Sequence, residues 1–329
     1  MATTTLGEFD LIARYFTRAP RRAVLGVGDD CALLAPLPAG QQLAVSCDML
    51  VEGRHFLSTV APQRLGHKAL AVNLSDLAAC GAEPVAFTLA LAMPRVDEDF
   101  LEGFSRGLFA LADAHSVDLV GGDTTAGPLN ICITVLGAVP GGQALLRSGA
   151  RPGDELWVSH PPDGGLGDAR LALEVFRGSV ALTGDSLEAV RLRMECPTPR
   201  VALGVALRGV ATSAIDLSDG LVGDLGHVLA RSAVGATVNA DALPRSAVLA
   251  AMPRAMQHEC TLAGGDDYEL LFSAPPGAES QVIAAAKRAE LAVARIGRID
   301  AAPGLRIVDG LGAPLLQRFV AFDHFRTAS

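Results

Sequence analysis

The segment IDLSDG, residues 215–220, places two aspartates and a glycine directly after a short apolar stretch. Five further segments also set aspartate in a turn at the end of an apolar run: GVGDD (26–30), SCD (46–48), NLSD (73–76), GGDTT (121–125) and GGDD (264–267). Carboxylate oxygens suit Mg²⁺, which takes oxygen ligands at near-octahedral geometry and usually shares them with phosphate. We therefore expect one composite site that holds several metal ions and a polyphosphate.

The length and composition indicate a globular protein of two domains. The chain has 329 residues, of which 50% are hydrophobic and 19% are charged, and this length exceeds what one small core requires. Helix and strand patterns alternate in both halves, and RSGARPGD at 147–154 is typical of a domain junction. The sequence thus predicts an α/β protein with mixed sheets, divided into residues 1–148 and 149–329.

Charge, hydropathy and cysteine usage indicate which classes of partner and which cellular compartment to expect. The net charge of −9 without a basic cluster argues against nucleic acid. No apolar run reaches the roughly 18 residues of a membrane span, and the N-terminal stretch MATTTLGEFD does not resemble a secretory signal. The six cysteines form no C-x-x-C pair and are expected to be free thiols. A cytoplasmic protein without membrane contact is the expectation.

The common phosphate-binding sequence motifs are absent from this chain. Lys68 and Lys287 are the only lysines, and neither lies in a G-x-x-x-x-G-K-[ST] loop, which excludes a P-loop. The glycines of GVGDDC (26–31) are followed by carboxylates, which would repel a pyrophosphate. A Rossmann fingerprint is therefore also absent. Because an acidic protein repels anions at long range, metal ions, arginines and backbone amides must hold the phosphates.

Hydrophobic periodicity places the aspartate segments on particular elements. In the first half, it predicts helices at 63–80 and 97–115, and strands at 42–48, 85–91, 117–120 and 130–139. In this assignment Asp48 ends a strand, Asp76 lies on a helix, and GGD follows a strand as a turn. In the second half, it predicts strands at 155–159, 212–216 and 268–272, helices at 166–177, 199–209 and 220–232, and a late hairpin near 301–310.

In order along the chain, GVGDD, SCDMLVEGRHF, NLSDLAACGA, GGDTT, RSGARPGD, IDLSDGL, GGDDYELL and FDHF resemble the thiamine-monophosphate kinase family. The resemblance covers essentially the whole chain. It implies ATP-dependent phosphorylation of thiamine phosphate to thiamine diphosphate with several Mg²⁺ ions. It also implies the two-domain fold shared with aminoimidazole ribonucleotide synthetase, an N-terminal domain that binds ATP and metal and forms a homodimer, and a C-terminal domain that completes the active site.

The resemblance also implies roles for individual residues. The implied metal ligands are Asp30, Ser46, Cys47, Asp48, Asp76, Asp123, Asp216 and Asp219. The implied ATP contacts are Gly122, Asp123, Arg147 and Ser218, and the implied substrate contacts are His55, Asp266 and Phe322. No catalytic base is expected, because the accepting phosphate oxygen is already anionic at neutral pH.

Two of these positions depart from the family pattern, and two have a plainer interpretation. Cys47 stands where threonine is usual, and because a thiol is a poor Mg²⁺ ligand, its role would pass through the backbone carbonyl. Asp266 stands where glutamate is usual, so its carboxylate reaches less far. His55 could be a structural histidine and Phe322 a packed C-terminal aromatic.

Direct in-line transfer of the γ-phosphoryl group is the expected mechanism, because two anions must be brought together and their charge neutralised. Two other functions stay open. An amide-activating synthetase of the same fold would release free phosphate, and the segments VEGRHF and FDHF argue against it. A catalytically silent protein that binds nucleotide and magnesium is disfavoured by the retained aspartates.

Overall fold

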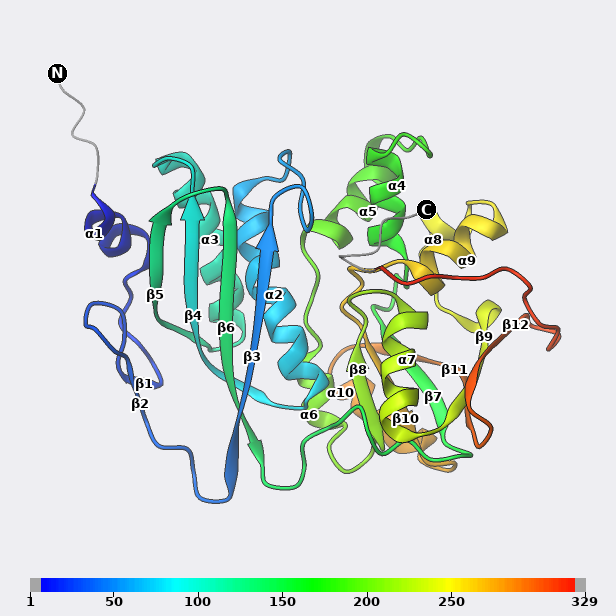
Figure 1. Cartoon of the computed structure of the whole chain (residues 1–329). Coiled ribbons are helices and arrows are strands. Elements are labelled where there is room, and N and C mark those ends of the chain that lie inside the picture. The colour runs from blue at the N-terminus through cyan, green and yellow to red at the C-terminus, as the bar shows by residue number, and fades with distance from the viewer. Residues whose placement is uncertain (1–6, 323–329) are drawn as a thin grey trace. The chain divides into compact units, whose positions relative to one another are not determined.

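The computed structural model describes residues 7–322, and the chain divides into two compact units. The first unit comprises the residues up to Leu77 together with Ala82–Gly142. The second comprises Ala78–Gly81 and the residues from Gln143 onward. Each unit contains a mixed sheet of its own (Figure 1).

The first unit is built on a four-stranded sheet in the order β3-β6-β4-β5. The strands are β3 (Gln41–Val51), β4 (Glu83–Met93), β5 (Asp118–Ala126) and β6 (Asn130–Pro140). β6 pairs antiparallel with β3 and β4, whereas β4 and β5 are parallel. Parallel neighbours need a crossover connection, and α3 (Glu98–Ala114) supplies it. With α2 (Pro62–Ala79), α3 covers one face of the sheet (Figure 1).

Smaller elements precede this sheet. A helical segment, α1 (Glu8–Leu11) continued by the π-helix η1 (Ile12–Phe16), begins the described chain. Two short strands, β1 (Ala23–Leu25) and β2 (Leu33–Leu34), then pair antiparallel. Their connecting loop carries the segment GVGDD, so its aspartates lie at the tip of a small hairpin.

Strand β3 presents two different faces. Ser46 and Asp48 lie on the face toward α2, as the bond from Ser46 to Asp76 shows. Alternate residues point the other way, and there Leu43, Val45 and Met49 are 49%, 59% and 52% exposed. No described helix covers this apolar face, and the β1–β2 segment packs over one end of it, against Ala86 and Ala138; we call it the uncovered face.

The second unit contains a six-stranded sheet in the order β12-β9-β11-β7-β10-β8. The strands are β7 (Glu155–His160), β8 (Ser213–Asp216), β9 (Gly235–Asn239), β10 (Leu270–Ala274), β11 (Ala292–Asp300) and β12 (Gly304–Val308). The hairpin expected near 301–310 lies further along the chain, where an antiparallel bridge joins Val308 to Pro314, and β12 itself pairs in parallel with β9. Leu305 and Ile307 explain the difference, since both pack against the core of this unit.

Helices complete the second unit: α4 (Asp168–Phe176), α5 (Gly184–Glu195), α6 (Val201–Ala206), α7 (Leu221–Ser232), the 3-10 turn η2 (Ala240–Ala242), α8 (Ala247–Ala250), α9 (Arg254–Ala263) and α10 (Glu279–Arg288). Its core joins apolar residues of the sheet and of α7, among them Val158, Ile215, Leu225, Leu271 and Ile296. Between residues 7 and 322, none of the helices has the length and apolar character needed to cross a lipid bilayer.

Candidate active site

In the first unit, strand β3 and helix α2 bring three candidate ligands together. Ser46 Oγ donates a hydrogen bond to Asp76 Oδ2 at 2.5 Å. The Asp48 N–H donates to Asn73 Oδ1 at 3.0 Å, and Asn73 is held in turn by the Ala69 carbonyl. The prediction that Asp48 ends its strand is wrong, because pairing with β6 continues to Val51. The aspartate is therefore fixed by a sheet ladder and not by a turn.

Gly122 and Asp123 lie inside strand β5, and the turn expected there is wrong. The parallel ladder with β4 pairs Gly122 with Leu89 and Asp123 with Ala90. Glycine permits this close approach, since a Cβ at position 122 would lie 1.8 Å from the Leu89 carbonyl oxygen. The strand thus continues through GGDTT.

Sheet register separates Asp123 from the ligands on β3. Residues paired across strands share a face, and one row runs Asp123–Ala90–Cys132–Met49. The neighbouring row runs Gly122–Leu89–Ile133–Asp48. Asp123 therefore lies on the uncovered face, and Asp48 lies on the face toward α2. The first unit does not by itself assemble these two carboxylates into one cluster.

Two more predicted residues lie in connecting segments of the first unit. Asp30 is exposed in the β1–β2 loop, where its N–H donates to Asp29 Oδ1 at 2.9 Å. His55 is half-buried, and its Nδ1 accepts the Val51 N–H at 3.0 Å, which leaves the proton on Nε2. The buried Lys68 donates from Nζ to the His55 carbonyl at 3.0 Å. Lys68 was not predicted, and only its rarity in the chain could have singled it out.

In the second unit, two sequence motifs far apart along the chain lie side by side. β8 and β10 are antiparallel and pair Asp216 with Leu270. Beyond the strands, the Tyr268 N–H donates to the Leu217 carbonyl at 2.8 Å and the Asp266 N–H to the Ser218 carbonyl at 2.9 Å. The segment IDLSDG therefore contacts GGDDYEL residue by residue. Helix α7 begins at Leu221 after an N-cap at Gly220, within one residue of the start predicted for the helix at 220–232.

A buried aspartate that the sequence analysis did not assign supports this turn. Asp224 Oδ2 accepts the N–H of Asp219 at 3.2 Å and of Gly220 at 3.1 Å. Burial, followed by the negative charges of Asp216 and Asp219, raises the pKa of Asp224 to about 8. The spacing of five residues from Asp219, one turn into the helix, was the signal available in the sequence.

The loop that carries Asp266 has an unusual backbone. Asp266 and Tyr268 have φ angles of 66° and 49°, in the left-handed region. Tyr268 Oη donates to Asp266 Oδ1 at 3.2 Å, which orients the carboxylate. Aspartate enters this region more readily than most residues, and such conformations cluster at functional sites, where the surrounding structure holds them.

The remaining predicted residues lie at the edges of the second unit. The Phe322 N–H donates to the Asp219 carbonyl at 3.1 Å, so the described end of the chain lies against the IDLSDG turn. The rest of the FDHF motif, 323–325, lies outside the described residues. Arg147 is exposed, and its carbonyl accepts a hydrogen bond from Ser232 Oγ at 3.1 Å.

The donors available at these positions fit magnesium better than a softer metal. They are carboxylate and hydroxyl oxygens, and the mutual repulsion of Asp216, Asp219 and Asp224 is of the kind that a cation relieves. Within 7–322, no three His, Cys, Asp or Glu side chains form a ready metal cage. That agrees with Mg²⁺ chemistry, in which one or two carboxylates act together with water and substrate phosphates.

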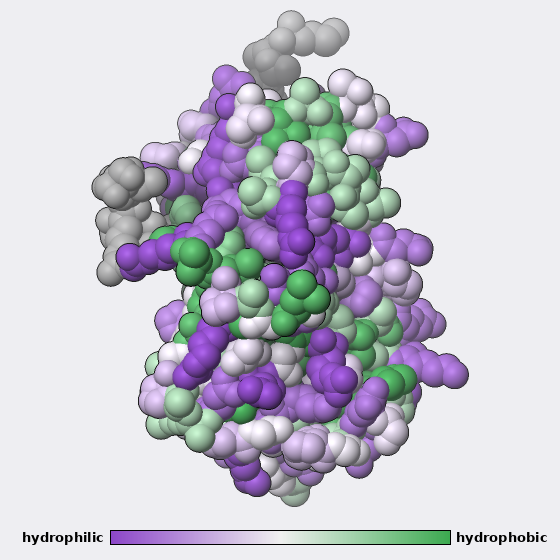
Figure 2. Space-filling view, turned by 90° about the vertical axis from the view of Figure 1, so that its right-hand side faces the viewer, coloured by the Kyte–Doolittle hydropathy of each residue, from purple (hydrophilic) through white to green (hydrophobic). Residues whose placement is uncertain are grey.

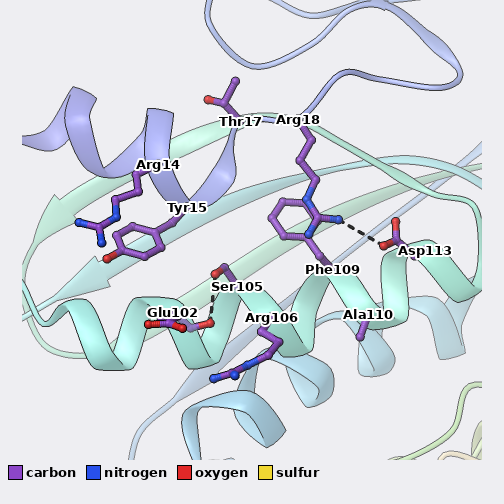
Figure 3. Close-up of a pocket in the computed structure, with 10 residues that line it drawn as sticks. All are labelled: Arg14, Tyr15, Thr17, Arg18, Glu102, Ser105, Arg106, Phe109, Ala110 and Asp113. Atoms are coloured by element: carbon purple, nitrogen blue, oxygen red, sulfur yellow. Dashed lines mark hydrogen bonds and ion pairs between the residues drawn. The ribbon is translucent and has the colours of Figure 1, made fainter.

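A cavity of about 640 Å³ in the first unit contains none of the predicted residues. It lies between η1 and α3, and Figure 3 shows Arg18 reaching from the N-terminal segment toward Asp113. The Arg18 guanidinium lies 3.7 Å from the centre of the Phe109 ring, and Arg14 pairs with Glu98 at 2.6 Å. These paired charges attach the N-terminal helix to α3, so the cavity is not the candidate site.

Comparison with known proteins identifies the family. Residues 28–139 match the family described as AIR synthase related protein, N-terminal domain, and residues 151–310 match its C-terminal domain. Thiamine-monophosphate kinase of Salmonella typhimurium is 44% identical over 98% of this chain and 99% of its own length.

Solved structures agree with that assignment. Thiamine-monophosphate kinase from Stenotrophomonas maltophilia superposes with a TM-score of 0.83 at 45% identity, covering 93% of this chain and 95% of that one. AaThiL complexed with AMPPCP and TMP superposes with a TM-score of 0.74 at 27% identity, covering 89% and 90%. The predicted two-domain α/β fold and the resemblance are confirmed, and the chain belongs to the thiamine-monophosphate kinase family of enzymes.

Proposed function

We propose that this protein transfers the γ-phosphoryl group of ATP to thiamine phosphate, giving ADP and thiamine diphosphate. One observation carries the proposal: the IDLSDG turn, which holds candidate metal and ATP ligands, is bonded both to Asp266 and to Phe322, the candidate substrate contacts. The similar AaThiL structure holds AMPPCP, an ATP analogue, and TMP. Cytoplasmic location stays a prediction, and the six free cysteines are consistent with a reducing compartment.

Magnesium would be held by the oxygen donors of each unit. In the first unit these are Asp30, Ser46, the Cys47 carbonyl, Asp48, Asp76 and Asp123, and in the second they are Asp216 and Asp219. Bound Mg²⁺ would neutralise the charge that opposes the approach of two phosphate groups. Ser46 orients Asp76 by its hydrogen bond, and Asp224 holds the amides of the IDLSDG turn in place.

The substrates would be positioned by separate groups. We assign ATP binding to Gly122, Arg147, Ser218 and, through a metal ion, Asp123, and we assign thiamine phosphate binding to His55, Asp266 and Phe322. Stacking of Phe322 on the cationic thiamine ring would contribute roughly 0.5–2 kcal/mol. Since the acceptor oxygen carries its own negative charge, the side chains position and stabilise in-line transfer and none removes a proton. We assign ATP binding and dimerisation to residues 1–148, and completion of the active site to residues 149–329.

A homodimer through the first unit is part of the proposal. The uncovered sheet face exposes Leu43, Val45 and Met49, an apolar row of a kind that marks association surfaces. Light scattering should show a dimer, and Val45→Lys should yield monomers. Leu311→Lys, a matched change at a 95% exposed leucine of the second unit, should leave the dimer intact. A monomeric wild-type protein would contradict this part.

The activity is tested by incubating the purified protein with ATP, thiamine phosphate and Mg²⁺ and separating the products. We expect thiamine diphosphate and ADP in equal amounts, no reaction with EDTA present, and poor use of free thiamine, which lacks the accepting phosphate. Orthophosphate without thiamine diphosphate would instead favour the amide-activating reaction.

A further inference from the structure

We propose that Gly223, in the first turn of α7, is a positioning residue for thiamine phosphate. Its missing side chain leaves the space in which the C-terminal strap, residues 315–322, crosses the helix, and the place of the strap sets the place of Phe322. The inference rests on the proposed function of Phe322 as a substrate contact. It adds a residue that touches neither substrate.

The strap is attached to the second unit at both ends. At its start, the Leu315 N–H donates to the Ile307 carbonyl at 2.9 Å, and Leu315 and Phe319 pack against the core. At its end, the Phe322 N–H donates to the Asp219 carbonyl at 3.1 Å. The side chain of Phe322 is 49% exposed, so about half of it faces solvent while its backbone is held.

Between these attachments the strap is held by the packing of Phe319 and by a hydrogen bond of 3.5 Å from Gln317 Nε2 to Glu259 Oε2. A cavity of about 420 Å³ lies beside it, lined by strap residues together with Val222, Gly223, Leu305 and Ile307. On the side of the molecule that carries β12, Figure 2 shows strongly hydrophobic residues in small groups among hydrophilic ones. Because the strap crosses α7 beside this cavity, a change at its contact with α7 can move it.

On α7, Gly223 lies against Ala321 of the strap. A Cβ built on Gly223 would lie 2.4 Å from the Ala321 Cβ. Methyl groups do not approach so closely, and the Ala321 Cβ is fixed to its backbone, so the strap itself would have to move by about 1 Å to restore ordinary contact. Phe322 is the next residue, and its bond to Asp219 would be displaced with it.

The same helix offers a matched control. Gly226 lies one turn further along α7, and a Cβ built there meets no atom within 4 Å. Alanine for glycine raises helix propensity similarly at both positions. A difference between Gly223→Ala and Gly226→Ala therefore reports the contact with the strap and not the stability of the helix.

Three variants test the proposal by steady-state kinetics: Gly223→Ala, Gly226→Ala and the double variant Gly223→Ala/Ala321→Gly. We expect Gly223→Ala to raise KM for thiamine phosphate about 2- to 30-fold, the range lost with one stacking aromatic, and to leave KM for ATP within about twofold. Gly226→Ala should match wild type. The double variant should recover the wild-type KM, because Ala321→Gly removes the methyl group that the new side chain meets.

Amide hydrogen exchange of the strap gives a readout that does not depend on activity. The peptide containing Phe322 should exchange faster in Gly223→Ala and at the wild-type rate in the other two variants. Wild-type kinetics or wild-type exchange in Gly223→Ala would overturn the proposal, as would a double variant that fails to recover. If the wild-type protein does not phosphorylate thiamine phosphate, the proposed function fails instead. The exchange rates still decide whether Gly223 determines the position of the strap.

Discussion

Glu269 and Arg200 form a two-point ion pair inside the second unit. Arg200 Nε lies 2.7 Å from Glu269 Oε2, and Arg200 Nη2 lies 2.5 Å from Oε1. Ser159 Oγ donates to the same carboxylate at 2.6 Å, and Arg193 Nη2 donates at 2.9 Å. Glu269 is completely buried. The glutamate of GGDDYELL therefore fixes strand β10 and the loop before it, and its oxygens are fully engaged by the protein.

Glu269→Gln should strongly destabilise the second unit. The change leaves the buried Arg200 without its counter-charge, and breaking one partner of a buried pair costs about 3–5 kcal/mol. Urea denaturation would measure the loss of unfolding free energy. Arg14→Gln removes an exposed pair with Glu98 and should cost at most about 1 kcal/mol. Equal effects of the two changes would contradict this interpretation of Glu269.

Asp76→Asn should abolish most turnover while leaving the fold intact. The amide keeps the shape of the side chain and can still accept from Ser46 Oγ, but it removes the charge that would bind metal. We expect kcat to fall about 10²- to 10³-fold, as when one group that stabilises the transition state is lost, with little change in Tm. A large fall in Tm with normal turnover per folded molecule would show that Asp76 is structural.

Asp266→Asn should raise KM for thiamine phosphate more than KM for ATP, since a contact to one substrate removes binding energy from that substrate alone. Asparagine also tolerates the left-handed φ of 66°, so the loop should keep its conformation. Asp266→Glu would restore the side chain usual in the family, but it suits this backbone less well. Equal rises in both KM values would assign Asp266 to the metal ligands instead.

Cys47→Thr should change kcat and both KM values by less than about twofold, because threonine suits a β-strand. The Cys47 side chain is exposed on the uncovered face of the sheet, where its Sγ lies 3.4 Å from Cys132 Sγ. Any contribution to the metal passes through the carbonyl, which the substitution retains. A fall in activity that Cys47→Ser does not share would point to the added methyl group and the packing of this face.

Asp267→Asn should stabilise the protein increasingly as the pH rises. Burial raises the pKa of Asp267 well above its ordinary value, although both carboxylate oxygens accept the Gly167 N–H. A raised pKa in the folded state means that the stability present at low pH is lost as the pH rises through that pKa. Asparagine cannot ionise and avoids the loss. The difference in unfolding free energy between Asp267→Asn and the wild type, measured by denaturation at several pH values, should grow as the pH rises. A difference that does not change with pH would contradict the raised pKa of Asp267.

Most of the main elements could be predicted because their signals are local. The apolar periodicity of 63–80 and 97–115 corresponds to α2 and α3, and the strands at 42–48, 85–91 and 130–139 correspond to β3, β4 and β6. Helices α5, α9 and α10 and strands β9 and β11 were not predicted. Strand β11, for example, has the sequence AVARIGRID, in which arginines interrupt the apolar run and only pairing with β7 and β9 defines the strand.

The sequence by itself determined the family, the aspartates and the residues that can bind a cation, because residue type and order suffice for those. Only the tertiary structure decided which carboxylates lie together. Register places Asp123 and Asp48 on opposite faces of one sheet, pairing of β8 with β10 brings Ser218 to Asp266, and the strap crosses α7 where Gly223 leaves room. Such contacts join residues distant in the chain, and no local pattern specifies a distant partner.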